Sequence, residues 1–154
     1  MFRFIAFLST LLAAAFGCNC PPPSPRQAYC TAAWVGTFQI QSKTSSPGYQ
    51  LDYGALPTRV FKATNGVPSL GSPVHINTSS VDQGCGVNKL EVNKEYLLSG
   101  RIEDGQMRML TCDQIQAVEW SNVDCEIKEN LENGGYEPCS SYTTPSIYST
   151  PSGR

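Results

Sequence analysis

The sequence predicts a small protein made mainly of β-strands, in which about five strands form an OB-like barrel with a helix near the C-terminus packed against it. Three observations support this fold class. Several short segments have strand-like patterns, the spacing of apolar residues then changes to that of a helix, and seven cysteines are available to staple the domain. The 154 residues suit one ordinary domain. An immunoglobulin-like sandwich fits less well, because it needs about seven strands and has no such helix.

The strand signals follow one another from residue 34 to residue 111. In segment 34–41, WVGTFQIQ, apolar residues alternate, and either the face of Trp34 or the face of Val35 would be the buried one. A turn is predicted at Pro47-Gly48. The other strand segments are 58–64 (TRVFKAT) before the turn dipeptide Asn65-Gly66, 72–79 (SPVHINTS), and a hairpin of 95–103 (EYLLSGRIE) and 106–111 (QMRMLT) around Asp104-Gly105.

A helix is predicted near the C-terminus. Val123, Ile127 and Leu131 are four residues apart, which is the spacing of one helical face. Asn133-Gly134-Gly135 is expected to end that helix. The last segment, 140–154, is rich in Ser, Thr and Pro and has little to bury, so we expect a disordered tail.

Residues 1–17 have the features of a secretory signal peptide. Arg3 supplies a positive charge, 4–16 is an apolar stretch broken only by a Ser-Thr pair, and Ala15 and Gly17 are small residues before a cleavage site. This apolar stretch is too short for a membrane span, which needs about 20 residues. We therefore expect cleavage after Gly17 and a soluble, secreted, extracellular protein.

All seven cysteines follow the predicted cleavage site, so we expect disulfides formed in an oxidising compartment. Six of them would form three bridges, with 15 possible connectivities, and one would be left over. A zinc site is the weaker alternative, because the sequence has no CxxC pair and its only histidine, His75, is far from any cysteine. The cysteines are Cys18, Cys20, Cys30, Cys85, Cys112, Cys125 and Cys139.

Charge and motifs exclude several classes of function. The 11 basic residues are matched by 13 acidic ones, so there is no basic excess for binding nucleic acid. HExxH, GxSxG and phosphate-loop motifs are absent, and His75 lies in a predicted strand, where we expect a surface or structural role. We therefore expect that the protein is not an enzyme. Asn77-Thr78-Ser79 is a sequon that predicts N-glycosylation of Asn77.

Cleavage after Gly17 would make Cys18 the first residue, with a free α-amine. The pKa of such an amine is about 8, so part of it is neutral at pH 7 and its nitrogen can bind a metal. The Cys18 carbonyl oxygen would be the second donor to a zinc ion with an open coordination position. Disulfides at Cys18 and Cys20 would hold this end in place before it binds. The prolines of 21–25 favour extended geometry and stiffen the segment up to Cys30.

This N-terminal segment resembles that of the tissue inhibitors of metalloproteinases. Their pattern, C-x-C-x-P-x-x-P-x-x-A-[FY]-C, is matched throughout by 18–30, CNCPPPSPRQAYC. The resemblance continues to about Cys139, and five landmarks in order with matching cysteine spacing make it specific. The later landmarks are CGV at 85–87, KEYLLSG at 94–100, LTCD at 110–113 and VEW at 118–120.

The resemblance implies a netrin-like OB fold over 18–139 and inhibition of zinc metalloendopeptidases, of the matrix metalloproteinase or disintegrin-metalloproteinase type. The zinc would belong to the protease, and the inhibitor would have no cofactor of its own. The resemblance also implies three disulfides, which are Cys18–Cys85, Cys20–Cys112 and Cys30–Cys139.

The resemblance further implies a role for each residue of the N-terminal segment. The amine and carbonyl of Cys18 would displace the zinc-bound water, and Asn19 would point into the S1′ pocket of the protease. Cys20 and Pro21 would follow the substrate cleft. Asp82, Gln83 and Gly84 would touch the enzyme, because the first disulfide pins their loop beside Cys18.

The sequence departs from the family at three points. Asn19 stands where vertebrate members usually have Thr or Ser, and Cys125 has no counterpart. The family's second, six-cysteine domain is not found in this sequence, so we expect no function that depends on it. We expect the predicted helix to bury Cys125 or an intermolecular bridge to use it, which gives a monomer or a dimer linked through Cys125. The alternative function is a netrin-like binding module without inhibitory activity, whose first cysteine usually follows another domain and so has no free amine.

Overall fold

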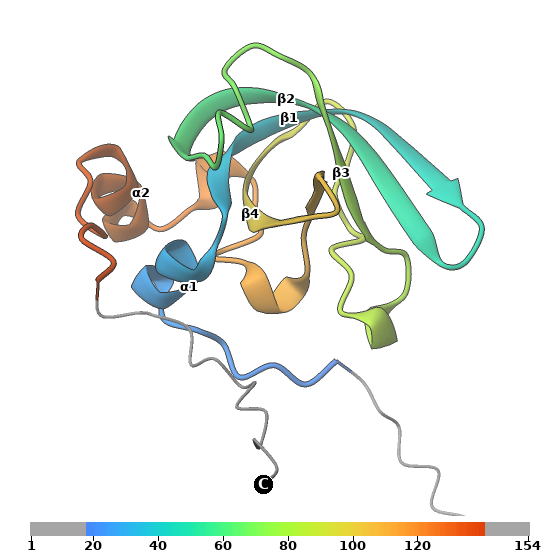
Figure 1. The fold of residues 1–154 in the computed structure, drawn as a ribbon, viewed down its shortest axis with the longest axis horizontal. Coiled ribbons are helices and arrows are strands. Elements are labelled where there is room, and N and C mark those ends of the chain that lie inside the picture. The colour runs from blue at the N-terminus through green and yellow to red at the C-terminus, as the bar shows by residue number, and fades with distance from the viewer. Residues whose placement is uncertain (1–17, 141–154) are drawn as a thin grey trace, which may run out of the picture.

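The computed structural model describes residues 18–140, shown as a ribbon in Figure 1. The strands are β1 (Trp34–Ser46), β2 (Gln50–Lys62), β3 (Val74–Ser79), β4 (Glu95–Glu103) and β5 (Gln106–Arg108). The helices are α1 (Pro25–Thr31) and α2 (Cys125–Glu132), and the 3-10 turns are η1 (Asp82–Gly84), η2 (Thr111–Asp113) and η3 (Trp120–Asn122). The predicted signal peptide, 1–17, and nearly all of the predicted tail lie outside the described residues.

The strands form a closed barrel in the order β1-β2-β3-β5-β4. All neighbouring strands are antiparallel except β3 and β5, which are parallel. This confirms the predicted class, a mainly β protein with a five-stranded OB-like barrel and a C-terminal helix.

Strand β1 closes the barrel, because it pairs with β2 along its length and with β4 through Trp34–Gln39. Both of its faces are buried. Trp34 and Phe38 point into the barrel core and meet edge-on, with ring centres 5.5 Å apart, whereas Val35 belongs to a second core outside the barrel. The sequence left open whether the face of Trp34 or the face of Val35 is buried, and the structure buries both.

The second core lies between the barrel wall and the two helices, which sit together on one side of the barrel in Figure 1. Tyr29 of α1, Leu131 of α2 and Tyr136 pack there against Val35 and Leu97 of the barrel. All five residues are at most 6% exposed. The C-terminal helix thus adds apolar burial to a barrel that is too small to bury much inside itself.

Strand β2 is longer than expected, because it begins at Gln50 rather than Thr58. Leu51, Tyr53 and Ala55 fill the barrel core and alternate with less buried residues. That alternation is the normal pattern of a half-buried strand. The third strand and the turns at Asp104-Gly105 and Asn65-Gly66 are where the sequence predicts them. The second strand of the hairpin is shorter than the predicted 106–111, because β5 ends at Arg108 and the 3-10 turn η2 begins at Thr111.

Helix α1 corrects the expectation of an extended segment up to Cys30. The side chain of Ser24 accepts a hydrogen bond from the Gln27 N–H at 3.2 Å, and Pro25 follows at the first helical position. Proline is favoured there because its missing N–H has no partner to lose. A cap and a proline therefore start a helix where the proline content alone suggested polyproline geometry.

Helix α2 confirms the predicted helix but begins only at Cys125. The side chain of Asp124 accepts a hydrogen bond from the Glu126 N–H at 2.9 Å and caps the first turn. The helix ends before Gly134, which has a φ of +69°. The expectation that the helix buries Cys125 was wrong, because this free cysteine lies on the first turn and is exposed.

His75 has the surface role that the sequence predicts. It lies on β3 with its side chain 76% exposed, and its Nδ1 is 2.7 Å from a carboxylate oxygen of Asp52.

Asn77, the predicted glycosylation site, is half-buried on the same strand, and its amide donates to the Gln106 side chain at 3.4 Å.

Gly100 of β4 is a test of how closely the barrel packs. A Cβ atom there would lie 2.1 Å from the Arg108 carbonyl oxygen and 2.5 Å from the Trp34 ring. We expect Gly100→Ala to lower the free energy of unfolding by about 1–3 kcal/mol, the usual cost of overpacking. The measurement is denaturant unfolding with the disulfides intact.

The matched control is Gly54→Ala in β2. The only tight contact of a Cβ there would be with the hydroxyl of Ser42, at 2.3 Å, and a side-chain hydroxyl can rotate away. The next atoms of Ser42, at 3.6 and 3.8 Å, are at ordinary contact distances. Equal losses for the two variants would show that the contact of Gly100 with the backbone is not tight.

Candidate functional site at the N-terminal edge

Three disulfides staple the described chain, and they are the pairs that the resemblance implies. Cys18–Cys85 and Cys20–Cys112 fasten the N-terminal segment to two loops of the barrel, with Cα atoms 5.0 and 5.4 Å apart. Cys30–Cys139 joins α1 to the segment after α2. Residues 18–20, which have no regular secondary structure, are thus held by covalent bonds.

The parallel pairing of β3 and β5 explains why two such distant loops meet. Parallel neighbours end on the same side of a sheet, and Cys85 and Cys112 each follow the C-terminal end of one of these strands. The two loops also bond to each other, because the Thr111 N–H donates to the Cys85 carbonyl at 2.8 Å. The barrel topology therefore prepares both anchor points of the N-terminal segment.

Side chains alternate along the segment. Cys18 and Cys20 are half-buried and face the barrel loops, whereas Asn19 and Pro21 are exposed. The disulfides therefore occupy one side of this short stretch, and the other side is free to contact a partner. We call residues 18–21 the N-terminal edge.

The turn η1 lies beside this edge because Cys85 immediately follows it. Asp82, Gln83 and Gly84 are all exposed, so the structure brings together every residue predicted to contact a protease. Cys85 has a φ of 54°, in the left-handed region that non-glycine residues rarely adopt.

Several residues that sequence reasoning missed hold this loop in shape. The Asn88 side chain donates to Asp82 Oδ1 at 3.0 Å and to the Ser80 carbonyl at 3.2 Å. The buried Thr78 hydroxyl donates to the Met109 carbonyl and accepts from the Val87 N–H. Asn88 belongs to no motif, and the glycosylation sequon that contains Thr78 gives no indication of these bonds. Their partners lie 6 to 31 residues away along the chain, so the bonds follow from the fold and not from a short sequence pattern.

Glycine is required just after the loop. A Cβ on Gly86 would lie 1.8 Å from the Ser79 carbonyl oxygen, a backbone atom that cannot turn aside. The CGV landmark at 85–87 thus has a steric reason for its central residue.

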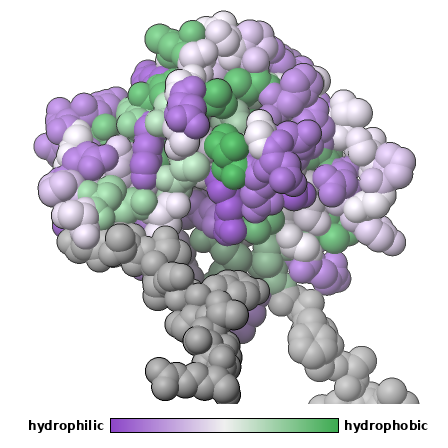
Figure 2. Space-filling model, in the orientation of Figure 1, coloured by the Kyte–Doolittle hydropathy of each residue, from purple (hydrophilic) through white to green (hydrophobic). Residues whose placement is uncertain are grey.

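A cavity of about 440 Å³ lies between the N-terminal edge and the loop after η1. Its wall combines both anchored cysteines with the polar side chains of Asp82 and Lys89 and the apolar side chains of Leu90 and Tyr96. On the face shown in Figure 2, by contrast, hydrophobic residues are scattered among hydrophilic ones. The features that distinguish the N-terminal edge are the cavity beside it and the two disulfides that anchor it.

The groups with clearly shifted pKa values lie elsewhere in the described structure. Burial raises the pKa of Tyr53, in the barrel core, to about 12, and burial also raises the pKa of Tyr29 and Tyr136 in the second core. These hydroxyls stay neutral near pH 7 and belong to the packing.

Comparison with known proteins agrees with this geometry. Residues 16–151 match the family described as tissue inhibitor of metalloproteinase. The chain belongs to the tissue inhibitor of metalloproteinase family. Members of this family are inhibitors and not enzymes, so the expectation that the protein is not an enzyme is confirmed.

The relatives are similar at the level expected of distant members of one family. Metalloproteinase inhibitor 3 of Xenopus laevis is 27% identical over 149 residues, covering 94% of this chain and 67% of the relative. Human metalloproteinase inhibitor 2 is 31% identical over 136 residues, covering 84% and 60%. The Caenorhabditis elegans protein named putative metalloproteinase inhibitor tag-225 is 25% identical over 151 residues, covering 84% and 94%. The chain therefore spans nearly all of the nematode relative but only 60% of the human one.

Within residues 18–140, no helix is both long and apolar enough to cross a membrane.

The Asn88 bonds can be tested on the loop itself. We expect Asn88→Ala to speed amide hydrogen exchange of Gly84, Cys85 and Gly86 by up to about tenfold, because each lost hydrogen bond contributes about 0.5–1.5 kcal/mol. The measurement is native-state exchange read by NMR or mass spectrometry. Asn122→Ala, at an exposed position in η3, is the matched control and should leave these amides unchanged. Equal protection in both variants would contradict the role of Asn88.

Proposed function

We propose that this protein is a secreted inhibitor of zinc metalloendopeptidases that acts through its N-terminal edge. Membership of the tissue inhibitor of metalloproteinase family supports metalloproteinase inhibition. The observation that carries the site is the anchoring of Cys18 and Cys20 by two disulfides beside the exposed η1 turn. The candidate targets are proteases of the matrix metalloproteinase or disintegrin-metalloproteinase type.

The chemistry at Cys18 depends on removal of residues 1–17. Cleavage after Gly17 frees the α-amine, and its nitrogen and the carbonyl oxygen of the same residue then form a five-membered chelate with the catalytic zinc of the protease. A catalytic zinc keeps one position open for such donors. The Cys18 sulfur takes no part in this chelate, because it is bonded to Cys85. The zinc is the protease's own, and the inhibitor needs no cofactor.

The remaining residues of the edge select the protease. Asn19 and Pro21 are exposed and turn away from the disulfides, so Asn19 enters the S1′ pocket and Pro21 continues along the substrate cleft. Asp82, Gln83 and Gly84 extend the contact beside them. Because the disulfides and the loop hydrogen bonds already fix this arrangement, little conformational entropy is lost on binding.

The first prediction tests the chelate. One alanine added before Cys18 in the mature protein moves the amine away from the zinc. We expect inhibition of a matrix metalloproteinase to weaken by more than about a hundredfold, since the loss of two zinc donors exceeds about 2.7 kcal/mol. The measurement is the inhibition constant with a peptide substrate. An alanine added after Arg154 is the control, and equal inhibition by both variants would rule out the mechanism.

The second prediction tests Asn19. An amide buried in an apolar S1′ pocket without hydrogen-bond partners costs about 1–3 kcal/mol. We expect Asn19→Thr to tighten inhibition of proteases with apolar S1′ pockets by about tenfold, measured as inhibition constants over a panel of enzymes. Asn122→Thr, on the exposed η3 turn, is the control. Weaker inhibition by Asn19→Thr would show that the target pocket binds the amide.

The first residue of the secreted chain distinguishes the proposed inhibitor from the alternative, a netrin-like binding module without inhibitory activity. N-terminal sequencing of the reduced and alkylated protein from culture medium should read Cys18, Asn19 and Cys20 in its first three cycles. A start at any residue other than Cys18 would favour the binding module.

A further inference from the structure

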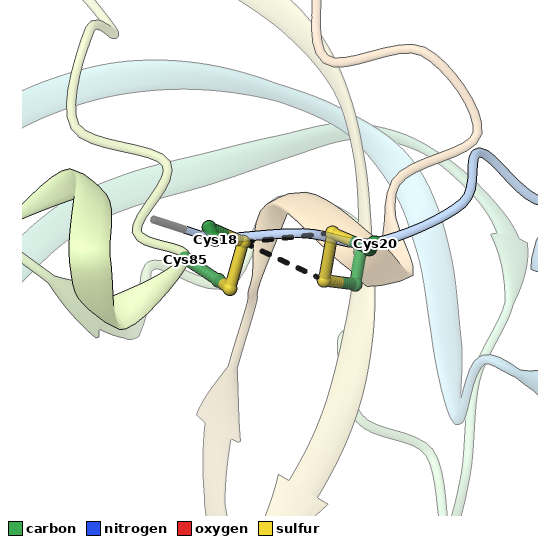
Figure 3. Close-up of side chains that lie close together, drawn as sticks. Cys18, Cys20 and Cys85 are labelled. Carbon is green, nitrogen blue, oxygen red and sulfur yellow. Dashed lines mark hydrogen bonds between the residues drawn. A yellow bond between two sulfur atoms is a disulfide. The ribbon is translucent and has the colours of Figure 1, made fainter. Parts of the chain in front are cut away.

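The two disulfides of the N-terminal edge touch each other. The Cys18 sulfur lies 3.5 Å from the Cys20 sulfur and 3.8 Å from the Cys112 sulfur, although it is bonded to neither. All four sulfurs of Cys18, Cys20, Cys85 and Cys112 lie within 4.8 Å of one another. Figure 3 shows the two yellow sulfur–sulfur bonds side by side, with the dashed lines running from Cys18 to the second bond.

We propose that these bonds form an exchange pair, in which opening of Cys18–Cys85 by an external thiol leads Cys18 to attack Cys20–Cys112. In the first step, the external thiolate bonds to the Cys85 sulfur and releases the Cys18 thiolate. In the second step, the Cys18 thiolate bonds to one sulfur of the second disulfide and releases the other as a thiolate, which takes a proton from water. Each step breaks one sulfur–sulfur bond and forms one, so no oxidant is needed.

The geometry favours the second step over reaction with another molecule. The Cys18 sulfur is nearly equidistant from both sulfurs of the target bond, so it lies beside that bond. Once Cys85 is released, the disulfide no longer restrains rotation about the Cys18 Cα–Cβ bond, so the Cys18 sulfur can change its direction of approach to the second bond. A nucleophile already in contact with its target has a very high effective concentration, up to about 10⁵–10⁸ M in well-oriented systems.

The environment leaves room for this exchange. Residues 18–20 belong to no helix or strand, and all four cysteines are only half-buried. The third disulfide, Cys30–Cys139, is outside the cluster and packs with the second core. The four clustered sulfurs are not metal ligands in this form, because each is bonded to another sulfur and a thiolate is needed for coordination.

The exchange changes the edge as a whole. When Cys18 bonds to Cys20 or Cys112, Cys85 and the η1 turn are no longer tied to the N-terminal segment. If the proposed function holds, one thiol would therefore disable the inhibitor through both disulfides. The exchange itself does not rest on that function.

The test follows a single thiol. The double variant Cys85→Ser, Cys125→Ser leaves Cys18 as the only free thiol, with the other two disulfides intact. The mature variant is held at pH 8 without added thiol and then labelled with N-ethylmaleimide at low pH, and the labelled peptides are identified by mass spectrometry. We expect label at Cys20 or Cys112 as well as at Cys18.

The matched control is Cys125→Ser, Cys139→Ser, in which Cys30 carries the free thiol far from the clustered pair. Label at sites other than the original thiol should be at least about tenfold lower in the control, because no disulfide is in contact with Cys30. Label confined to Cys18 in the first variant would overturn the proposal. Equal spreading in both variants would also overturn it, because exchange would then be intermolecular.

A second measurement covers the case in which the Cys85→Ser variant does not fold. The Cys125→Ser protein is treated with one equivalent of dithiothreitol and labelled in the same way. Among molecules labelled at Cys85, a second label at Cys20 or Cys112 supports the exchange, and a second label at Cys18 overturns it. Neither measurement involves a protease, so their failure is distinct from a failure of inhibition.

Discussion

The arrangement of the site depends on one constraint, the fastening of residues 18–20, which form no helix or strand, to two loops of the barrel. Cys18–Cys85 and Cys20–Cys112 span 67 and 92 residues. In the chain-entropy description, cross-links over loops of this length stabilise the folded state by about 4–5 kcal/mol each. Ordering three residues costs about 1–2 kcal/mol apiece in backbone entropy. The two bonds therefore exceed the cost of holding the edge, which has no secondary structure of its own.

The barrel contributes the positions of the anchors. Because β3 and β5 are parallel neighbours, Cys85 and Cys112 emerge on the same side of the barrel, although their strands are distant in sequence. An antiparallel pair would place the corresponding loops on opposite sides. The Thr111 bond to the Cys85 carbonyl then fixes the spacing of the loops. Closure of the barrel and the position of the N-terminal edge thus depend on the same pairing of strands.

Local sequence signals predicted the elements whose determinants are local. The Asp104-Gly105 turn and the four-residue spacing of Val123, Ile127 and Leu131 each identified an element. Helix α1 was missed because the cap at Ser24 was outweighed by the prolines around it, although Pro25 itself favours the start of a helix.

Local sequence signals could not predict the features that depend on contacts between residues distant in sequence. The β3–β5 pairing and the bond from the Thr78 hydroxyl to the Met109 carbonyl, 31 residues away, join segments through contacts that no short motif encodes. The pairing of cysteines is of the same kind, because the spacing of the cysteines left 15 connectivities open. Only the family resemblance implied the three bonds that the structure contains. The residues expected to contact a protease could therefore be named from the sequence, but the reason they lie together could not.

Half-buried and exposed residues alternate along the N-terminal edge, and the two sets have different consequences for the structure. Cys18 and Cys20 fix where the chain runs, and their replacement would change the position of every residue of the edge. Asn19 and Pro21 make no disulfide and are exposed, so substitutions there change what a partner meets while the barrel and its anchors stay as they are. The unusual asparagine at position 19 is thus placed where a substitution changes the exposed surface without altering the fold. A change in the disulfides has no such freedom, because the sulfurs of both bonds are in contact and disturbing one disturbs the other.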